Sequence, residues 1–93
     1  MVNEVRASHI LVGSQAEATQ LLNRIASGES FESLARKHSK CPSGRKGGDL
    51  GYFKRGMMVK EFENVAFNLE KGAISRPVKT QFGYHLIKVL DKR

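Results

Sequence analysis

The sequence predicts an α+β domain in which helices pack against a small, largely antiparallel sheet. Strong strand patterns lie near the two ends of the chain, over residues 5–12 and 84–90. Between them, apolar residues recur in three places with the period of an amphipathic helix. With one short strand and one extended segment added, the predicted order is strand, helix, helix, loop, strand, helix, strand, strand.

The first half of the chain predicts one strand followed by two helices. Residues 5–12 become β-branched and apolar toward their end, as in a strand. Ser14 and Glu17 form a capping box, in which each side chain bonds a free backbone amide at the start of a helix. Gly28 ends this helix, and Ser30 caps a shorter second one. The apolar face of the second helix consists of Phe31, Leu34, Ala35 and His38.

The second half predicts a loop, a short strand, a helix, an extended segment and a final strand. These elements cover residues 39–49, 50–53, 59–69, 74–80 and 84–90, in that order. Gly72 closes the helix. Pro77 cannot donate a backbone hydrogen bond, so we expect the extended segment either at a sheet edge or in irregular pairing. The turn after Thr80 should join it to the last strand as a hairpin.

The composition predicts one globular domain over residues 1–93, too small for a second core. The single cysteine excludes an internal disulfide, and its spacing from the three histidines matches no zinc motif, so we expect no metal. No apolar run reaches the roughly 18 residues of a membrane span. Residues 1–6 lack the apolar stretch of a secretion signal, so we expect a cytoplasmic protein.

The positive charge of the chain is concentrated in residues 36–60, which we call the basic stretch. It holds eight basic residues and one acidic residue, Asp49, and so accounts for the whole net charge of +7. One interpretation is a solvated face that keeps the protein soluble. The other is attraction of an anionic partner: nucleic acid, an acidic protein segment, or a membrane surface with peripheral association. Both interpretations stay open on the sequence alone.

Two histidines lie inside the terminal strands, among apolar neighbours. The two-residue strand period places both His9 and His85 on apolar faces. If the strands pair, the rings lie within hydrogen-bond reach, because opposite Cβ atoms are about 4.5–5.5 Å apart. A pair of core histidines that holds two strands in register is the simpler alternative.

The segment between the histidines carries the remaining candidate residues. Cys41 is either an inert small residue or a thiol activated by nearby basic side chains. Leu50, Met58 and Phe62 flank a glycine-hinged turn and can converge, either as plain core or as the wall of a small dry pocket. No nucleophile elbow is present, which argues against a covalent hydrolase.

Five short motifs, in order along essentially the whole chain, resemble those of the parvulin-type peptidyl-prolyl cis/trans isomerases. Each motif alone is weak, but five in register are specific. The motifs are SHILV at 8–12, SKCPSG at 39–44, GGDLGYF at 47–53, GMMV at 56–59 with Phe62 and Phe67, and FGYHLIK at 82–88.

This resemblance implies both a fold and a site. The family fold is a four-stranded antiparallel sheet surrounded by about four helices. The pocket for the substrate proline would be Leu50, Met58 and Phe62. The catalytic residues would be His9, Cys41, Thr80 and His85, with Thr80 beside the histidines in a polar network. No cofactor is implied, because no bond is broken. The position of Cys41 is often aspartate in the family. We expect catalysis without a covalent intermediate, not attack of Cys41 on the carbonyl.

The resemblance also bears on substrates. The branch of the family that acts on phosphorylated Ser/Thr-Pro has a long basic loop after the first strand, whereas Gly13 and Ser14 here lead directly into a helix. We therefore expect phosphorylation-independent activity on unfolded or flexible proline-containing polypeptides, which assists protein folding. Arg45 and Lys46 are candidates for contacts with acidic residues that flank the proline. We expect a stand-alone monomeric catalytic domain.

Two other functions stay open on the residues alone. One is a non-catalytic module whose basic stretch binds nucleic acid or anionic lipid. The other is a peptide-binding chaperone without turnover, whose affinity for unfolded chains would survive loss of Cys41 and both histidines.

Overall fold

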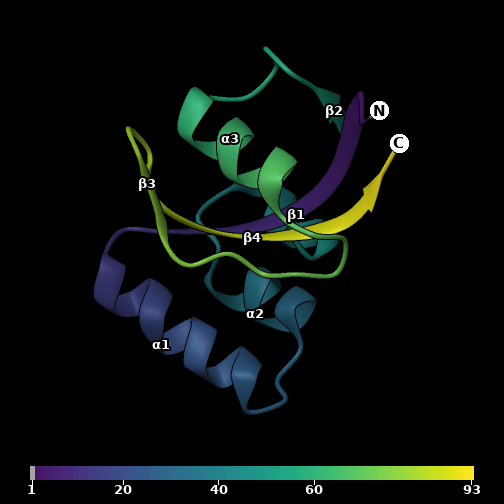
Figure 1. Cartoon of the computed structure of the whole chain (residues 1–93). Coiled ribbons are helices and arrows are strands. Elements are labelled where there is room, and N and C mark those ends of the chain that lie inside the picture. Colours follow the sequence, from purple (N-terminus) through teal and green to yellow (C-terminus); the bar gives the residue numbers. More distant parts are fainter. Residues whose placement is uncertain (1) are drawn as a thin grey trace.

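A single antiparallel sheet of four strands forms the centre of the molecule in the computed structural model, which describes residues 2–93 (Figure 1). Its order is β2-β1-β4-β3, so the two terminal strands pair with each other in the middle. The strands are β1 (Glu4–Val12), β2 (Asp49–Lys54), β3 (Val78–Thr80) and β4 (Gly83–Lys92). The α+β class and the antiparallel sheet predicted from the sequence are confirmed, and β3 lies at the edge after Pro77, as expected.

Three α-helices and one 3₁₀ helix make up the predicted set of about four helices. They are α1 (Gln15–Ala26), α2 (Phe31–His38), α3 (Lys60–Asn68) and the 3₁₀ helix η1 (Pro42–Lys46). Both predicted N-caps form: Ser14 accepts a hydrogen bond from the Glu17 amide, and Ser30 accepts one from the Ser33 amide, both at 3.2 Å. Of the predicted capping box, the described residues form this forward bond from Glu17 to Ser14 but not the return bond to the Glu17 carboxylate. The sequence predicts only a loop over residues 39–49, where the structure forms η1.

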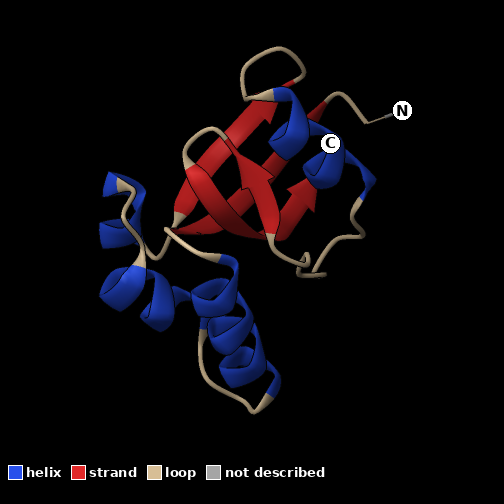
Figure 2. Ribbon diagram, turned by 90° about the vertical axis from the view of Figure 1, so that its left-hand side faces the viewer, coloured by secondary structure: helices blue, strands red, loops and turns tan. Residues whose placement is uncertain are grey.

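The helices cover both faces of the sheet, with α3 on one side and α1 and α2 on the other (Figures 1 and 2). Each face has its own apolar core, so the expectation that the chain is too small for a second core was wrong. The core under α3 consists of Val5, Ala7, Phe53, Phe62, Ala66, Phe67, Ile87 and Val89. The core under α1 and α2 consists of Ile10, Val12, Ala18, Leu21, Phe31, Leu34, Ala35 and Leu86. Since successive side chains of a strand point to opposite faces, β1 and β4 contribute to both cores.

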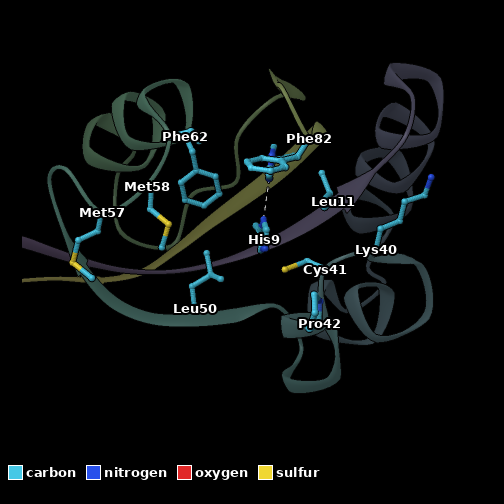
Figure 3. Close-up of a pocket in the computed structure, with 12 residues that line it drawn as sticks. His9, Leu11, Lys40, Cys41, Pro42, Leu50, Met57, Met58, Phe62 and Phe82 are labelled. Atoms are coloured by element: carbon cyan, nitrogen blue, oxygen red, sulfur yellow. Dashed lines mark hydrogen bonds between the residues drawn. The ribbon is translucent and has the colours of Figure 1, made fainter.

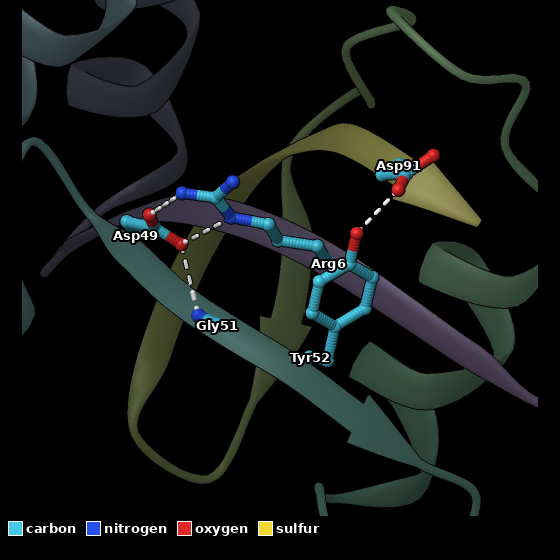
Figure 4. Close-up of polar contacts among 5 residues, drawn as sticks. All are labelled: Arg6, Asp49, Gly51, Tyr52 and Asp91. Carbon is cyan, nitrogen blue, oxygen red and sulfur yellow. Dashed lines mark hydrogen bonds and ion pairs between the residues drawn. The ribbon is translucent and has the colours of Figure 1, made fainter. Parts of the chain in front are cut away.

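Polar contacts fix β2 against the central strands (Figure 4). The Asp49 carboxylate accepts hydrogen bonds from the Arg6 guanidinium on β1 and from the Gly51 amide, the latter at 2.9 Å. The Tyr52 hydroxyl donates to the Asp91 carboxylate on β4. Because Asp49 immediately precedes Leu50 in β2, its contacts fix the start of the strand that carries Leu50.

The two ends of the described chain lie side by side. The Asn3 amide donates to the Arg93 carbonyl at 2.8 Å, and the Arg93 amide donates to the Glu4 carbonyl at 2.9 Å. Among the helices of residues 2–93, none is long and apolar enough to cross a membrane.

Candidate active site

A cavity of about 520 Å³ lies on the α3 side of the sheet, next to the segment that joins α2 to β2 (Figure 3). Its wall is mainly apolar, and it includes all three residues predicted for the proline pocket. The lining residues are His9, Leu11, Lys40, Cys41, Pro42, Leu50, Met57, Met58, Val59, Phe62, Phe82 and His85. The structure therefore makes these three side chains a pocket wall as well as part of the adjoining core.

Three consecutive parts of the chain bring the apolar wall together. Leu50 comes from the start of β2, Met58 from the turn after β2, and Phe62 from the first turn of α3. Leu50 and Met58 are half-buried, whereas Phe62 is only 2% exposed and forms the pocket floor. The Phe62 ring meets both histidine rings edge-on, at centroid distances of 5.5 Å each. This packing holds the floor rigid.

His9 and His85 lie side by side in the floor of the cavity. Their Nδ1 atoms are 2.9 Å apart, as the predicted contact requires. The two residues are not directly opposite, however: His85 pairs with Leu11, and His9 pairs with Ile87. The histidines are thus diagonal neighbours on one face, a spacing that long side chains bridge.

Both imidazoles are neutral at pH 7. Burial, and secondly the nearby His85, lowers the pKa of His9 to about 4. Burial also lowers the pKa of His85 below its ordinary value. Because one hydrogen must lie between the two Nδ1 atoms, one ring carries hydrogen on Nδ1 and the other accepts there. The two rings are therefore opposite tautomers.

The hydrogen-bond chain continues behind His85. The Nε2 atom of His85 lies 2.8 Å from the Thr80 hydroxyl, which also accepts a hydrogen bond from the Phe82 amide at 3.2 Å. Thr80 is buried and does not line the cavity. The structure therefore places it as a support that orients His85, not as a group that faces a ligand.

Beyond His9, the hydrogen-bond network extends to Cys41, the only cysteine in the sequence. The Nε2 atom of His9 lies 3.2 Å from the Ser43 hydroxyl, which donates to Cys41 Sγ at 3.3 Å. If the Thr80 hydroxyl donates to His85, then His85 donates to His9. His9 in turn donates to Ser43, and Ser43 donates to the sulfur of Cys41. Ser43 was not predicted from the sequence, because a serine in a glycine-rich loop carries no distinctive pattern.

The remaining predicted residues are less central. Cys41 is half-buried at the wall of the cavity. Arg45 lies on a neighbouring hollow, and Lys46 lines neither hollow. Met57 and Phe82, which were not predicted as site residues, also line the cavity, and their side chains are 64% and 61% exposed. Such exposure of large apolar side chains is typical of a binding rim.

This arrangement suits the binding of a small apolar ring beside a polar group. The floor and one wall are apolar, and the polar atoms belong to a neutral network that is already hydrogen-bonded. The imidazoles do not contact the thiol directly, since Ser43 lies between His9 and Cys41. Residues 2–93 contain no group of three or more His, Cys, Asp or Glu side chains placed to hold a metal ion.

Comparison with known proteins places this geometry in a family. Residues 9–91 match the family model of the PPIC-type PPIase domain, or rotamase. Foldase protein PrsA 1 of Bacillus cereus is 54% identical over 89 residues, which cover 95% of this chain and 31% of that protein. The chain thus spans about a third of the length of the PrsA relatives it matches.

Solved structures agree with the sequence match. A crystal structure of the peptidylprolyl isomerase PrsA from Bacillus anthracis has a TM-score of 0.97 at 46% identity, covering 99% of this chain and 43% of that chain. The solution structure of NmPin, the parvulin of Nitrosopumilus maritimus, has a TM-score of 0.89 at 47% identity, covering 98% of this chain and 99% of that chain. The chain belongs to the PPIC-type peptidyl-prolyl cis/trans isomerases, the parvulins.

Proposed function

We propose that this parvulin domain holds a substrate proline in the Leu50–Met58–Phe62 pocket and assists protein folding by rotating the X–Pro bond without a covalent intermediate. The observation that carries this proposal is the apolar cavity with a buried, neutral histidine pair in its floor. Its size accommodates a pyrrolidine ring together with the flanking backbone.

The pocket acts on the amide by binding and by excluding water. Rotation about an amide bond has a barrier of about 18–20 kcal/mol, which arises from resonance in the planar form. A roughly 10⁴-fold acceleration requires removal of about 5.5 kcal/mol from this barrier. A pocket that grips the ring lets the acyl side turn around it. Exclusion of water also removes hydrogen bonds that favour the planar, charge-separated amide.

The polar network sets the wall that faces the turning carbonyl. Thr80 and the two histidines fix one another's orientation through hydrogen bonds. Ser43 bonds both His9 and the sulfur of Cys41, and so orients the thiol. In this role Cys41 contributes electrostatics at the pocket wall. Thr80, His85 and Ser43 are positioning residues in the proposal, because they act through neighbouring groups.

The non-covalent role of Cys41 predicts that a carboxylate can replace the thiol. Cys41→Asp should keep kcat/KM within about tenfold of the wild-type value, because only the electrostatics of the wall change. Loss of a true nucleophile costs far more, about a thousandfold or greater. A loss of that size in a folded Cys41→Asp protein contradicts the proposal.

The central test measures cis/trans exchange in a proline-containing peptide by NMR. Leu50→Ala removes a half-buried side chain from the cavity wall, and we expect kcat/KM to fall at least about tenfold. Leu69→Ala is a matched control, because Leu69 is also half-buried on the same core but does not line the cavity. Wild-type exchange no faster than the uncatalysed rate rejects the function. Binding of unfolded chains without exchange favours the chaperone alternative.

We also propose that activity is independent of phosphorylation. Only two residues, Gly13 and Ser14, separate the end of β1 from the start of α1, which leaves no room there for a basic loop. Paired Ser-Pro and phosphoSer-Pro peptides should therefore be isomerised at similar rates. A preference above about tenfold for the phosphorylated peptide contradicts this expectation, since it corresponds to more than about 1.4 kcal/mol.

A second proposed property is binding of the basic stretch to an anionic surface, either nucleic acid or an acidic membrane. Within residues 2–93, Arg55 is the one basic residue of this stretch that forms an ion pair, with Glu63 at 3.6 Å. The other cations there lack a carboxylate partner. Binding to DNA or to anionic vesicles should weaken steeply as salt rises. No binding to either at low salt rejects the idea.

Two further expectations about the whole protein stay predictions from the sequence. One is a monomeric state, which sedimentation at several concentrations measures. The other is a cytoplasmic location with peripheral membrane association, which cell fractionation measures.

A further inference from the structure

A second hollow, of about 410 Å³, adjoins the proline pocket. Lys40, Cys41 and Pro42 line both hollows, so the two meet at this wall. The rest of the second hollow is polar and basic, with Arg36 from the last turn of α2 and Arg45 from η1 on its sides. The wall that carries the thiol therefore separates an apolar site from a cationic one.

The cations of this hollow have no partner among the described residues. Arg36 and Arg45 are exposed, and neither forms an ion pair or a side-chain hydrogen bond within residues 2–93. The carboxylate of Glu32, one turn before Arg36 on α2, is paired with Lys88 at 3.4 Å. Lys40 extends along the rim away from Cys41 (Figure 3), with its ammonium group over Gly13. The two arginines therefore dominate the hollow.

We propose that this hollow is a subsite for an acidic side chain, Asp or Glu, that lies close to the substrate proline in sequence. The inference rests on the proposed function, because it needs the proline to occupy the neighbouring pocket. Guanidinium groups present planar pairs of N–H donors that match a carboxylate. A peptide in extended form advances about 3.3 Å per residue, so two hollows with a shared wall are spanned within about three residues.

A local subsite makes a different prediction from a general positive field. A field attracts any acidic peptide, wherever its charge lies, and weakens with the loss of any basic residue. A subsite favours one position of the acidic residue relative to proline, and depends on Arg36 and Arg45 in particular. Position dependence and residue dependence together identify it.

The test compares kcat/KM for peptide pairs that carry Glu or Gln at each of three positions on either side of the proline. The variants are Arg36→Gln, Arg45→Gln and the double variant. Arg76→Gln is the matched control, because it makes the same substitution and charge change at an exposed arginine that lines neither hollow and forms no ion pair in residues 2–93. Circular dichroism verifies that each variant is folded.

We expect the wild-type protein to prefer Glu over Gln by about 3- to 10-fold at one position, as for one or two partly exposed charge pairs. The ratio of kcat/KM for the Glu peptide to that for the Gln peptide should fall toward one in the double variant and should be unchanged in Arg76→Gln. Equal rates for Glu and Gln at all positions overturn the subsite, as does an equal loss of preference in Arg76→Gln. Absence of catalysis on every peptide instead rejects the proposed function, so the two failures are distinguishable.

Discussion

His9 and His85 show how a polar pair is made compatible with an apolar floor. Each ring nitrogen described above has a hydrogen-bond partner, through the other histidine, Ser43 or Thr80. The rings are also held by the edge-on contact with Phe62. A charge on either imidazole would lose its water without gaining an anion. The neutral state is therefore built into the packing.

The buried His9 predicts a specific loss of stability in mild acid. Its pKa is about 4 in the folded protein, below the ordinary value of 6.5, so the unfolded chain binds the proton first as pH falls. The stability that the neutral His9 contributes to the folded state is fully present above about pH 7, and it is lost as the pH falls from about 6.5 to 4. At pH 5 the loss is about 2 kcal/mol in the free energy of unfolding.

Denaturant unfolding at pH 7.5 and at pH 5 measures this loss. His9→Asn removes the titrating ring and keeps a polar group near the position of Nδ1, so its stability should change less between the two pH values. Equal pH dependence in the two proteins would mean that His9 titrates normally when folded.

The same neutral pair predicts how activity depends on pH. Because the pKa of His9 is about 4 and burial lowers the pKa of His85 below its ordinary value, kcat/KM should show no titration centred near 6.5, the ordinary imidazole pKa. Peptide exchange rates measured by NMR above and below this pH test the point. An activity that changes with a midpoint near 6.5, in a protein shown to be folded, would indicate that a charged histidine takes part.

At the level of elements, the approach of β2 to β1 depends on one glycine. Gly48 has φ of +87°, and a Cβ atom built there would lie 2.3 Å from the His9 carbonyl oxygen. The Gly48 carbonyl accepts a hydrogen bond from the His9 amide at 3.0 Å. A side chain at this position must push the two segments apart, just where His9 and Leu50 enter the cavity.

Gly48→Ala should therefore destabilise the protein and lower its activity. Gly72→Ala is a matched control, since Gly72 has φ of +88° but open space around its Cβ position. Both variants carry the strain of a left-handed residue, about 1–2 kcal/mol. We expect Gly48→Ala to lose at least about 2 kcal/mol more than the control, measured by thermal or chemical unfolding. Equal losses would show that the contact relaxes freely.

Elements with strong local patterns were predictable from the sequence. The caps at Ser14 and Ser30 depend on residues three apart, and the faces of His9 and His85 depend only on the two-residue strand period. The edge position of β3 follows from the missing amide of Pro77. None of these features requires knowledge of a distant partner.

Features that depend on distant pairing were not predictable in the same way. The diagonal placement of His9 and His85 results from the register of β1 with β4, which includes an irregularity between Arg6 and Ala7. The loop composition of residues 39–49 did not predict η1, so the contact between Ser43 and His9 could not be predicted either. The neighbouring hollow needs both α2 and η1 in place, so Arg36 could not be selected from the sequence.

For the whole molecule, the central strand pair couples the two cores. Val5, Ala7, Ile87 and Val89 face α3, whereas Ile10, Val12 and Leu86 face α1 and α2. The active-site cavity lies on the α3 side, yet its histidines come from the same two strands that support the other core. Truncation of a side chain in either core should therefore destabilise the whole sheet.

Leu21→Ala tests this coupling from the side opposite the cavity. Leu21 is 3% exposed on α1, and its truncation should cost about 2–5 kcal/mol through lost burial and a residual cavity. Unfolding followed by far-UV circular dichroism and by tyrosine fluorescence should give coincident transitions, because Tyr52 on β2 and Tyr84 on β4 report on the shared sheet. The folded variant should retain its isomerase rate, since the cavity lining is unchanged. Separate transitions for the two probes would show that the α1 side melts by itself, and that the sheet does not bind the cores into one cooperative unit.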